Sequence, residues 1–318
     1  MNSPALPSPD LTAVLNGTSP LPQLGVIQAQ GEDAANFLHN QLTNDVLLLP
    51  VGQSRLAAFC NAKGRMQASF VVTKTAPDTV LLVMHQDLLA QTLKRLSMFV
   101  LRAKVKLSDA SGQWQLRGLL GGSAEAVLAD AAPWHTMALD GAHAVALYPT
   151  VVGDAQVHRA LWLAPAGSAL PAGPEVTPEV WAWAEVMSGV ALVSQPVFEA
   201  FVPQMLNYES VGGVNFKKGC YPGQEVVARS QFRGTLKRRT ALVHSPLALV
   251  AGQDVFTPAD PEQPCATVLL SAPRPDGHGH DALVSGTLES MHSGWRAGSA
   301  EGAVLDLLPL PYALLEDI

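Results

Sequence analysis

Cysteine is scarce in this chain. Its 318 residues include only Cys60, Cys220 and Cys265, which lie far apart in the sequence. An odd and widely spaced set does not form a disulfide framework, so the composition favours a reducing compartment, and we expect a cytoplasmic protein.

Positive charge and long apolar runs are also lacking. The formal net charge is −7, which argues against broad direct contact with nucleic acid phosphates. The opening residues have no basic group before an apolar stretch, as a secretory signal would have. No segment reaches the roughly 20 apolar residues that cross a bilayer, so we expect no membrane contact. Apolar residues nevertheless make up 48% of the chain, enough for two or three domains with their own cores.

The first third of the chain predicts a compact α+β unit. An amphipathic helix begins after Gly31 and carries Ala34, Phe37 and Leu38 on one face. A second helix is expected over residues 86–99. The expected strands are residues 24–29, 54–61, 66–74, 80–84 and 100–107.

The remainder of the chain alternates short strands with turns. Strands are expected over residues 112–120, 143–151 and 160–164. Thr177 and Pro178 mark the start of a helix that ends at Gly189, since a hydroxyl cap and an N-terminal proline favour helix initiation. From Lys237 onward, short apolar strands broken by Gly and Pro predict an all-β module, a small barrel.

The most informative segment is a glycine-rich loop around one thiol. Lys217 and Lys218 precede Cys220, and nearby cations stabilise a thiolate and lower its pKa. Gly219 and Gly223 permit backbone conformations that other residues resist. Cys220 is therefore a candidate reactive or metal-contacting thiol. The alternative is that Cys220 is a small buried apolar residue in a loop that merely turns.

Three segments resemble the YgfZ family, which is related to glycine-cleavage aminomethyltransferases. The phrase KGCYPGQE is similar to the family motif K-G-C-[FY]-x-G-Q-E, and the likeness extends over FVPQMLNYESVGGVNFKKGCYPGQEVVARSQFRG. GEDAANFLHNQLTNDV and CNAKGRMQASFVV resemble further family segments, so the likeness spans most of residues 24–300.

The resemblance implies an α+β fold: a three-lobed, aminomethyltransferase-like ring around a folate pocket, with a C-terminal small β-barrel. The implied domains are residues 20–50 plus 110–235, an inserted unit of residues 51–109, and residues 236–318. The implied cofactor is tetrahydrofolate.

The chain departs from the transferases at two places. Their aspartate beside the folate's reacting nitrogen corresponds to Gln67 and Ala68 here, so aminomethyl transfer is not expected. Their pterin-binding glutamate corresponds to Met187, and Glu185 lies on a different side of the helix. Glu185 is either a pterin partner or a solvated helix residue.

Several other polar residues are candidates for ligand binding. Gln204 and Asn207 either line a polar pocket or bond to local backbone. Arg229 and Arg233 belong to a basic cluster, with Lys237, Arg238 and Arg239, that either binds a folate tail or a protein partner or forms a charged surface. The segment His278–Gly279–His280–Asp281 has metal-ligand residue types but no second cluster, so we expect no metal site.

We therefore expect an accessory protein that supports assembly or repair of iron–sulfur clusters in target enzymes, and thereby affects tRNA thiolation indirectly. Its partners are expected to be iron–sulfur enzymes or assembly proteins, with Cys220 as the working thiol. Two alternatives remain: a folate-dependent one-carbon transferase that uses different residues, and a folate-sensing module without thiol chemistry.

Overall fold

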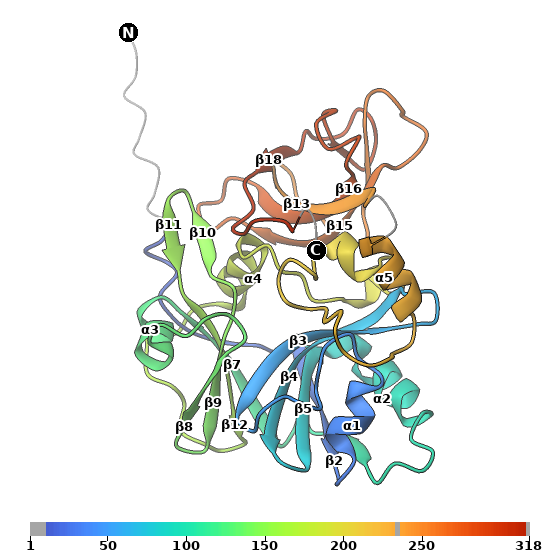
Figure 1. The fold of residues 1–318 in the computed structure, drawn as a ribbon. Coiled ribbons are helices and arrows are strands. Elements are labelled where there is room, and N and C mark those ends of the chain that lie inside the picture. Colours follow the sequence, from blue (N-terminus) through green and yellow to red (C-terminus); the bar gives the residue numbers. More distant parts are fainter. Residues whose placement is uncertain (1–10, 233–235, 316–318) are drawn as a thin grey trace.

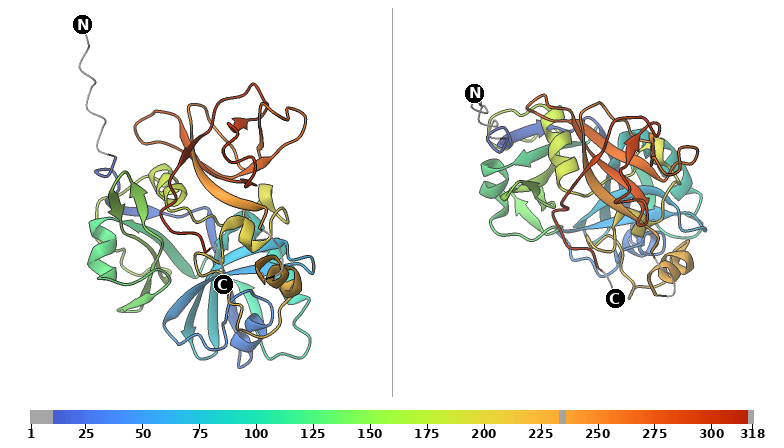
Figure 2. Two further views of the ribbon diagram at one scale, coloured as in Figure 1. Left: turned by 45° about the horizontal axis from the view of Figure 1, so that its top comes forward. Right: turned by 90° about the horizontal axis from the view of Figure 1, so that it is seen from above.

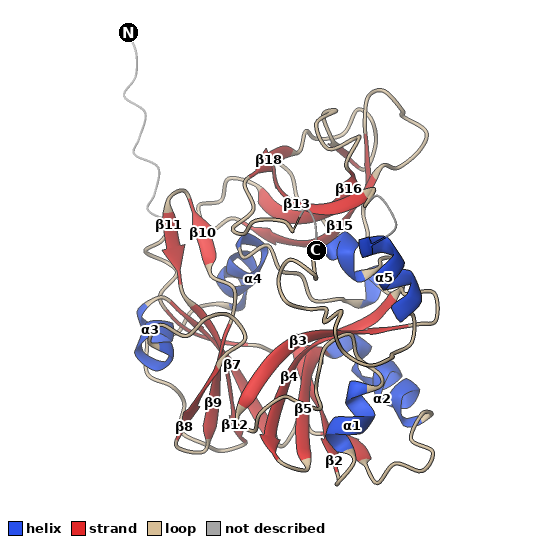
Figure 3. Ribbon diagram, in the orientation of Figure 1, coloured by secondary structure: helices blue, strands red, loops and turns tan. Residues whose placement is uncertain are grey.

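The structure is a computed structural model that describes residues 11–232 and 236–315. Three groups of strands surround a common centre, with the C-terminal group above the other two (Figure 1; Figure 2). Most helices lie on the outside of these strand groups (Figure 3). All strand pairs of the named sheets are antiparallel.

The first lobe contains a five-stranded sheet and the longest helix. Its strands are, in spatial order, β1 (Gly17–Pro20), β7 (Trp114–Leu120), β12 (Arg159–Pro165), β9 (Ala142–Ala146) and β8 (Thr136–Leu139). Helix α3 (Gly122–Leu128) packs against one face of the sheet, and the hairpin β10 (Thr150–Val152) and β11 (Ala155–Val157) extends from it. Helix α4 (Pro178–Met187) packs so closely that a Cβ atom on Gly118 would lie 2.2 Å from the Trp181 ring.

The second lobe is a five-stranded sheet built largely from the predicted α+β unit. Its strands are, in spatial order, β3 (Gln53–Cys60), β4 (Met66–Ala76), β5 (Thr79–His85), β2 (Leu24–Gln30) and β6 (Lys106–Asp109). The short helices α1 (Ala34–His39), η1 (Gln86–Leu88) and α2 (Leu89–Ser97) accompany it.

Two expectations about this region were wrong. Strand β2 pairs with β5 and β6, so the predicted boundary at residue 50 divides one sheet. The strand expected over residues 100–107 is mostly loop, and only Lys106–Asp109 pairs with β2. The alternation of basic and apolar residues there reflects exposure of the loop, in which Leu101 is 86% exposed.

The third lobe is a curled six-stranded sheet with its own core around Trp295 (Figure 1). Its strands are, in spatial order, β17 (Arg296–Ala297), β14 (Asp254–Phe256), β15 (Ala266–Pro273), β16 (His280–Thr287), β13 (Arg238–Ser245) and β18 (Asp306–Leu308). Helix α4 contacts β15 and β16, which joins this lobe to the first.

A long segment between α4 and β13 crosses all three lobes. It contains η2 (Gln195–Val197), η3 (Pro203–Leu206) and α5 (Gln224–Phe232). The backbone N–H of Met66 donates to Phe201 O, which ties the segment to β4. The C-terminal residues return to the same place: the Tyr312 hydroxyl donates to Gly189 O at 2.7 Å, and Leu315 N donates to Ser210 Oγ at 3.1 Å.

Among residues 11–232 and 236–315, none of the helices has the length and apolar character needed to cross a bilayer.

Candidate functional site

The Cys220 thiol lies in an exposed bend held by a buried lysine. Cys220 is exposed, whereas Lys218 is only 8% exposed. The Lys218 ammonium donates to His39 O and, at 2.8 Å, to Leu42 O, and it lies 4.7 Å from the centre of the Tyr221 ring. Burial lowers the pKa of Lys218 to about 8, against the attraction of Asp45 and Cys220. The bend therefore presents a thiol beside a fixed ammonium group.

Glycine is required where the bend meets the second lobe. Gly223 has φ +80°, and a Cβ atom there would lie 2.4 Å from Asn61 O. This contact places α5 against the turn between β3 and β4, where Gly64 packs against Val226. Gly223, a position where the sequence analysis expected unusual backbone freedom, thus forms a close backbone contact with residues 61 and 64 of the turn after β3.

The two lysines before the thiol have different environments. Lys217 is exposed, and its backbone N–H donates to Asn215 Oδ1 at 2.8 Å. The other cysteines also differ from Cys220. Cys60 is buried, and burial raises the pKa of its thiol, while Cys265 is intermediate in exposure. Of the three cysteines, Cys220 is thus the one that is exposed to solvent.

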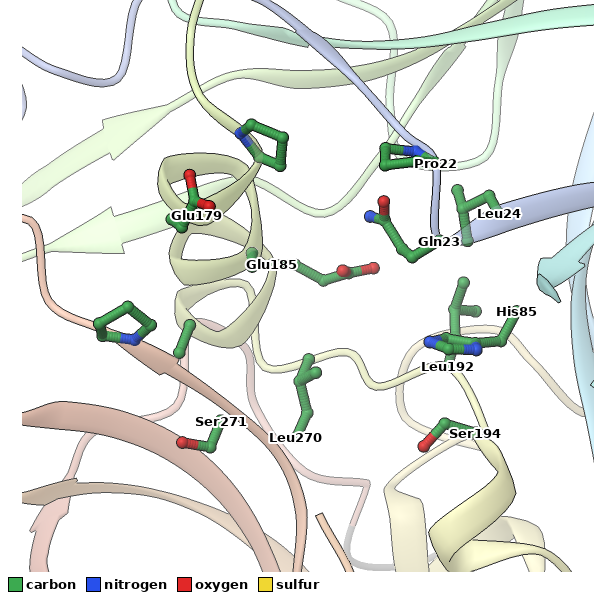
Figure 4. A pocket seen from close by; sticks show the side chains of 14 residues that line it. Pro22, Gln23, Leu24, His85, Glu179, Glu185, Leu192, Ser194, Leu270 and Ser271 are labelled. Atoms are coloured by element: carbon green, nitrogen blue, oxygen red, sulfur yellow. The ribbon is translucent and has the colours of Figure 1, made fainter. Parts of the chain in front are cut away.

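A cavity of about 360 Å³ lies where the three lobes meet. Leu24 and His85 of the second lobe, Glu185 of α4 and residues 270–273 of β15 contribute to its lining. Figure 4 shows Glu185 extending from α4 towards Gln23 and His85. Burial raises the pKa of Glu185, opposed by Arg159 and His85. The Glu185 carboxylate therefore lies in a cavity wall, and its role as a pterin partner stays a prediction.

Arg159 is a buried cation without a full set of partners. It is 3% exposed, and its Nη1 donates to Tyr148 O at 3.3 Å. Its Nε and Nη2 atoms have no partner within the described residues, and its guanidinium lies 4.6 Å from the centre of the Trp181 ring. Burial lowers the pKa of Arg159 to about 10, opposed by Glu185.

Arg159 and Glu185 both line a narrow inner cavity of about 30 Å³, together with Trp134, Tyr148 and Trp181. This space shares Glu185, Leu24 and Leu192 with the larger cavity, so the two adjoin. The inner cavity has room for only about one or two water molecules, so a ligand in the larger cavity would meet Glu185 directly and the unpaired nitrogens of Arg159 only at its inner end.

The positions of the two transferase carboxylates contain no acid. Met187 is 7% exposed and belongs to the apolar core. Gln67 Nε2 donates to Glu199 Oε1 at 2.7 Å, and Asn61 Nδ2 donates to the same oxygen at 2.9 Å. The carboxylate nearest to Gln67 is thus already engaged by two amides.

Gln204 and Asn207 bond to backbone that is distant in sequence, rather than to the local backbone that was one of the two alternatives. Gln204 Nε2 donates to Val227 O at 2.7 Å, and Asn207 Nδ2 donates to Thr240 O at 2.9 Å. Both amides are fully buried. They fix η3 against α5 and β13.

The basic cluster does not form one surface in the described residues. Arg229 is exposed on α5, while Arg233 lies outside the described residues. Arg239 is buried in an ion pair with Glu209, and Arg238 Nη2 donates to Cys265 O at 2.8 Å.

Asp281 belongs to the segment His278–Gly279–His280–Asp281 and is fully buried. It links the third lobe to helix α4 of the first lobe. Its carboxylate accepts from Trp183 Nε1 at 2.7 Å and from Arg274 Nη1 at 3.3 Å, and it contacts His244 Nδ1 at 2.9 Å. Among the described residues, no group of three or more His, Cys, Asp or Glu is arranged to hold a metal ion.

Sequence reasoning missed Arg159 and Trp134. A signal was available for Arg159, because a single arginine precedes the apolar run ALWLA of a strand, and a buried arginine requires partners. Trp134 gave no signal, since its backbone conformation, φ +71°, is unusual for a bulky residue and cannot be read from neighbouring residue types.

Comparisons with known proteins agree with this architecture. Residues 19–159 match the family described as the GCVT N-terminal domain. The chain is 26% identical to "tRNA-modifying protein YgfZ" of Photorhabdus laumondii, over 92% of this chain and 91% of that protein. It is 28% identical to the protein of the same name from Cronobacter sakazakii, over 90% of each chain.

Structural comparison supports the predicted fold class. The glycine cleavage system aminomethyltransferase T of Bartonella henselae matches with a TM-score of 0.71 and 15% identity, over 95% of this chain and 88% of that one. This likeness concerns the fold alone, and it confirms the expected aminomethyltransferase-like α+β architecture. The matched family and the relatives of similar length support the YgfZ/GcvT-like family that the sequence motifs indicate.

Proposed function

We propose that this chain is a folate-site accessory protein that supports assembly or repair of iron–sulfur clusters in enzymes that modify tRNA. The names of its relatives, which describe tRNA-modifying proteins, support the link to tRNA. The acidic net charge of −7 favours an indirect role through partner enzymes over direct RNA binding.

The observation that carries this proposal is the exposed Cys220 thiol beside the buried ammonium of Lys218. A protein cluster site normally requires about four ligands, so one thiol acts only transiently or together with ligands from a partner. An exposed bend suits that use because a partner can approach it. The cluster is then the cargo of this protein.

Tetrahydrofolate fits the residues around the central cavity. The cavity of about 360 Å³ has a volume typical of small-molecule sites. The Glu185 carboxylate supplies acceptors for an amino-pyrimidine edge, and the unpaired nitrogens of Arg159 supply donors. Bound folate would supply one-carbon chemistry, while these residues bind and orient its ring.

The thiol role is tested by complementation in a bacterial strain that lacks its own homologue. We expect Cys220→Ser to fail to restore iron–sulfur enzyme activity and tRNA thiolation, whereas Cys265→Ser restores both. Equal protein levels are checked by immunoblot. Full restoration by Cys220→Ser would remove the thiol from the mechanism.

The folate role is tested by titration with tetrahydrofolate under anaerobic conditions. We expect Glu185→Gln to weaken binding about tenfold, since one charge-assisted hydrogen bond contributes about 1.5–3 kcal/mol. Absence of saturable binding to the unmodified chain would refute this part of the proposal.

A further inference from the structure

A second cleft, of about 480 Å³, opens beside the edge strand β3. Its walls include Gln53 and Arg55 of β3, Asn44 from the preceding loop, and Trp134 and His135 from the segment before β8. The cleft therefore lies between the first and second lobes. Its volume is within the range of small-molecule sites.

Among the described residues that line this cleft, Arg55 is the only one of the types Asp, Glu, Lys and Arg. It is half-buried, and its Nη1 makes a long contact of 3.5 Å with Asn44 Oδ1. Asp45 is close enough for Arg55 to contribute to lowering its pKa, but Asp45 Oδ1 is already engaged by His39 Nδ1 and Leu48 N. The guanidinium therefore retains donors for a ligand.

The amides around Arg55 are fixed in place. Asn44 Nδ2 donates to Leu56 O at 2.8 Å and to Gly212 O at 2.7 Å. Gln53 exchanges two hydrogen bonds of 3.3 Å with the backbone of Thr136. A site whose walls are already fixed loses little conformational entropy when a ligand binds.

Trp134 supplies a fixed aromatic wall. Its φ of +71° is unfavourable for a bulky side chain, and its indole N–H donates to Val211 O at 2.7 Å. Backbone strain of this kind persists only where the surrounding structure enforces it, and it concentrates at ligand sites. Trp134 also lines the inner cavity of Arg159, so it forms a wall common to both spaces.

We propose that this cleft binds an aromatic anion, in which a carboxylate or phosphate group is joined to an aromatic ring through a short linker. Arg55 pairs with the anionic group, because a guanidinium presents paired donors that match both groups. The Trp134 indole contacts the ring. Two sources share this chemistry: the aminobenzoyl-glutamate end of a folate and a nucleoside monophosphate. The folate arm rests on the proposed function, whereas the nucleotide arm does not, so the two probes distinguish the cases.

The test is calorimetric titration of the full chain with p-aminobenzoyl-glutamate and, separately, with adenosine monophosphate. For whichever probe binds, we expect Arg55→Gln to weaken binding roughly 10-fold to 100-fold. Arg102→Gln is the matched control, since Arg102 is an exposed arginine on a different loop. Preference for the first probe identifies the cleft as a site for a folate tail, and preference for the second identifies it as a nucleotide site.

A second measurement does not rely on affinity alone. The indole N–H resonance of Trp134, identified by its loss in Trp134→Phe, should shift with the same midpoint as the calorimetric titration. The proposal is overturned if neither probe binds with a Kd below about 1 mM. It is equally overturned if Arg55→Gln binds as well as the unmodified chain.

Discussion

Replacement of Lys218 by methionine is the sharpest test of how the thiol bend is held. The ammonium makes two hydrogen bonds to the carbonyl oxygens of His39 and Leu42 and contacts the Tyr221 ring. Each charge-assisted bond contributes about 1.5–3 kcal/mol and the ring contact about 0.5–2 kcal/mol. The fall in pKa from 10.5 to about 8 corresponds to an opposing penalty of about 3 kcal/mol. We therefore expect Lys218→Met to lower the free energy of unfolding by about 1–5 kcal/mol at pH 7.

The pH dependence has a defined sign. Between pH 8 and pH 10.5 the unfolded chain keeps the proton on Lys218, whereas the folded chain releases it. The unfolded state then binds more protons, so this lysine makes the folded state more stable as the pH rises through that window. The stability difference between the unmodified chain and Lys218→Met should therefore grow with pH.

The assay is urea unfolding at several pH values, with Cys220 alkylation followed in parallel. The alkylation rate should change in Lys218→Met, because the bonds to His39 O and Leu42 O that hold the bend are lost. Lys217→Met is the matched control, since Lys217 is exposed, and it should change stability by less than about 0.5 kcal/mol. Equal behaviour of the two variants would refute the assignment of Lys218 as the anchor of the bend.

Three further outcomes are expected. Gly223→Ala should lower the free energy of unfolding by more than about 2 kcal/mol, because a Cβ atom would lie 2.4 Å from a backbone oxygen. Gly52 has φ +78° but open space around it, so Gly52→Ala should lower that free energy by only about 1 kcal/mol. Urea unfolding of the two variants compares these values. Glu209→Leu leaves a buried arginine without its carboxylate and should cost about 3–5 kcal/mol, so a smaller shift of the urea midpoint would contradict the pairing. In the native protein, mass spectrometry should find Cys220 alkylated before Cys60, and early labelling of Cys60 would show that its burial is not maintained.

Local patterns predicted elements well where residues that are close in sequence define a strand or helix. The strand expected over residues 24–29 appears as Leu24–Gln30, and the helix expected from Pro178 ends at Met187, next to the predicted stop at Gly189. In both places the residues that fix the element are neighbours in sequence. Their side chains therefore carry enough information on their own.

Features that depend on distant partners were not predictable in this way. Nothing within residues 24–30 indicates pairing with residues 79–85 and 106–109, which is why the boundary at residue 50 divided a sheet. The motif around Cys220 predicted a loop around a thiol, but it left the exposure of that thiol open and did not reveal that His39 O and Leu42 O bind Lys218. The same applies to Arg159, whose unpaired nitrogens become visible only when the cavity around it is assembled.

Residues 312–315 bind to the segment that leads from α4 to β13. Besides the bonds from Tyr312 and Leu315, Arg239 Nη2 donates to Leu315 O at 3.0 Å, so the same arginine that neutralises Glu209 also holds the end of the chain. A substitution that displaces residues 312–315 would therefore disturb both that arginine and the loop that leads to the thiol.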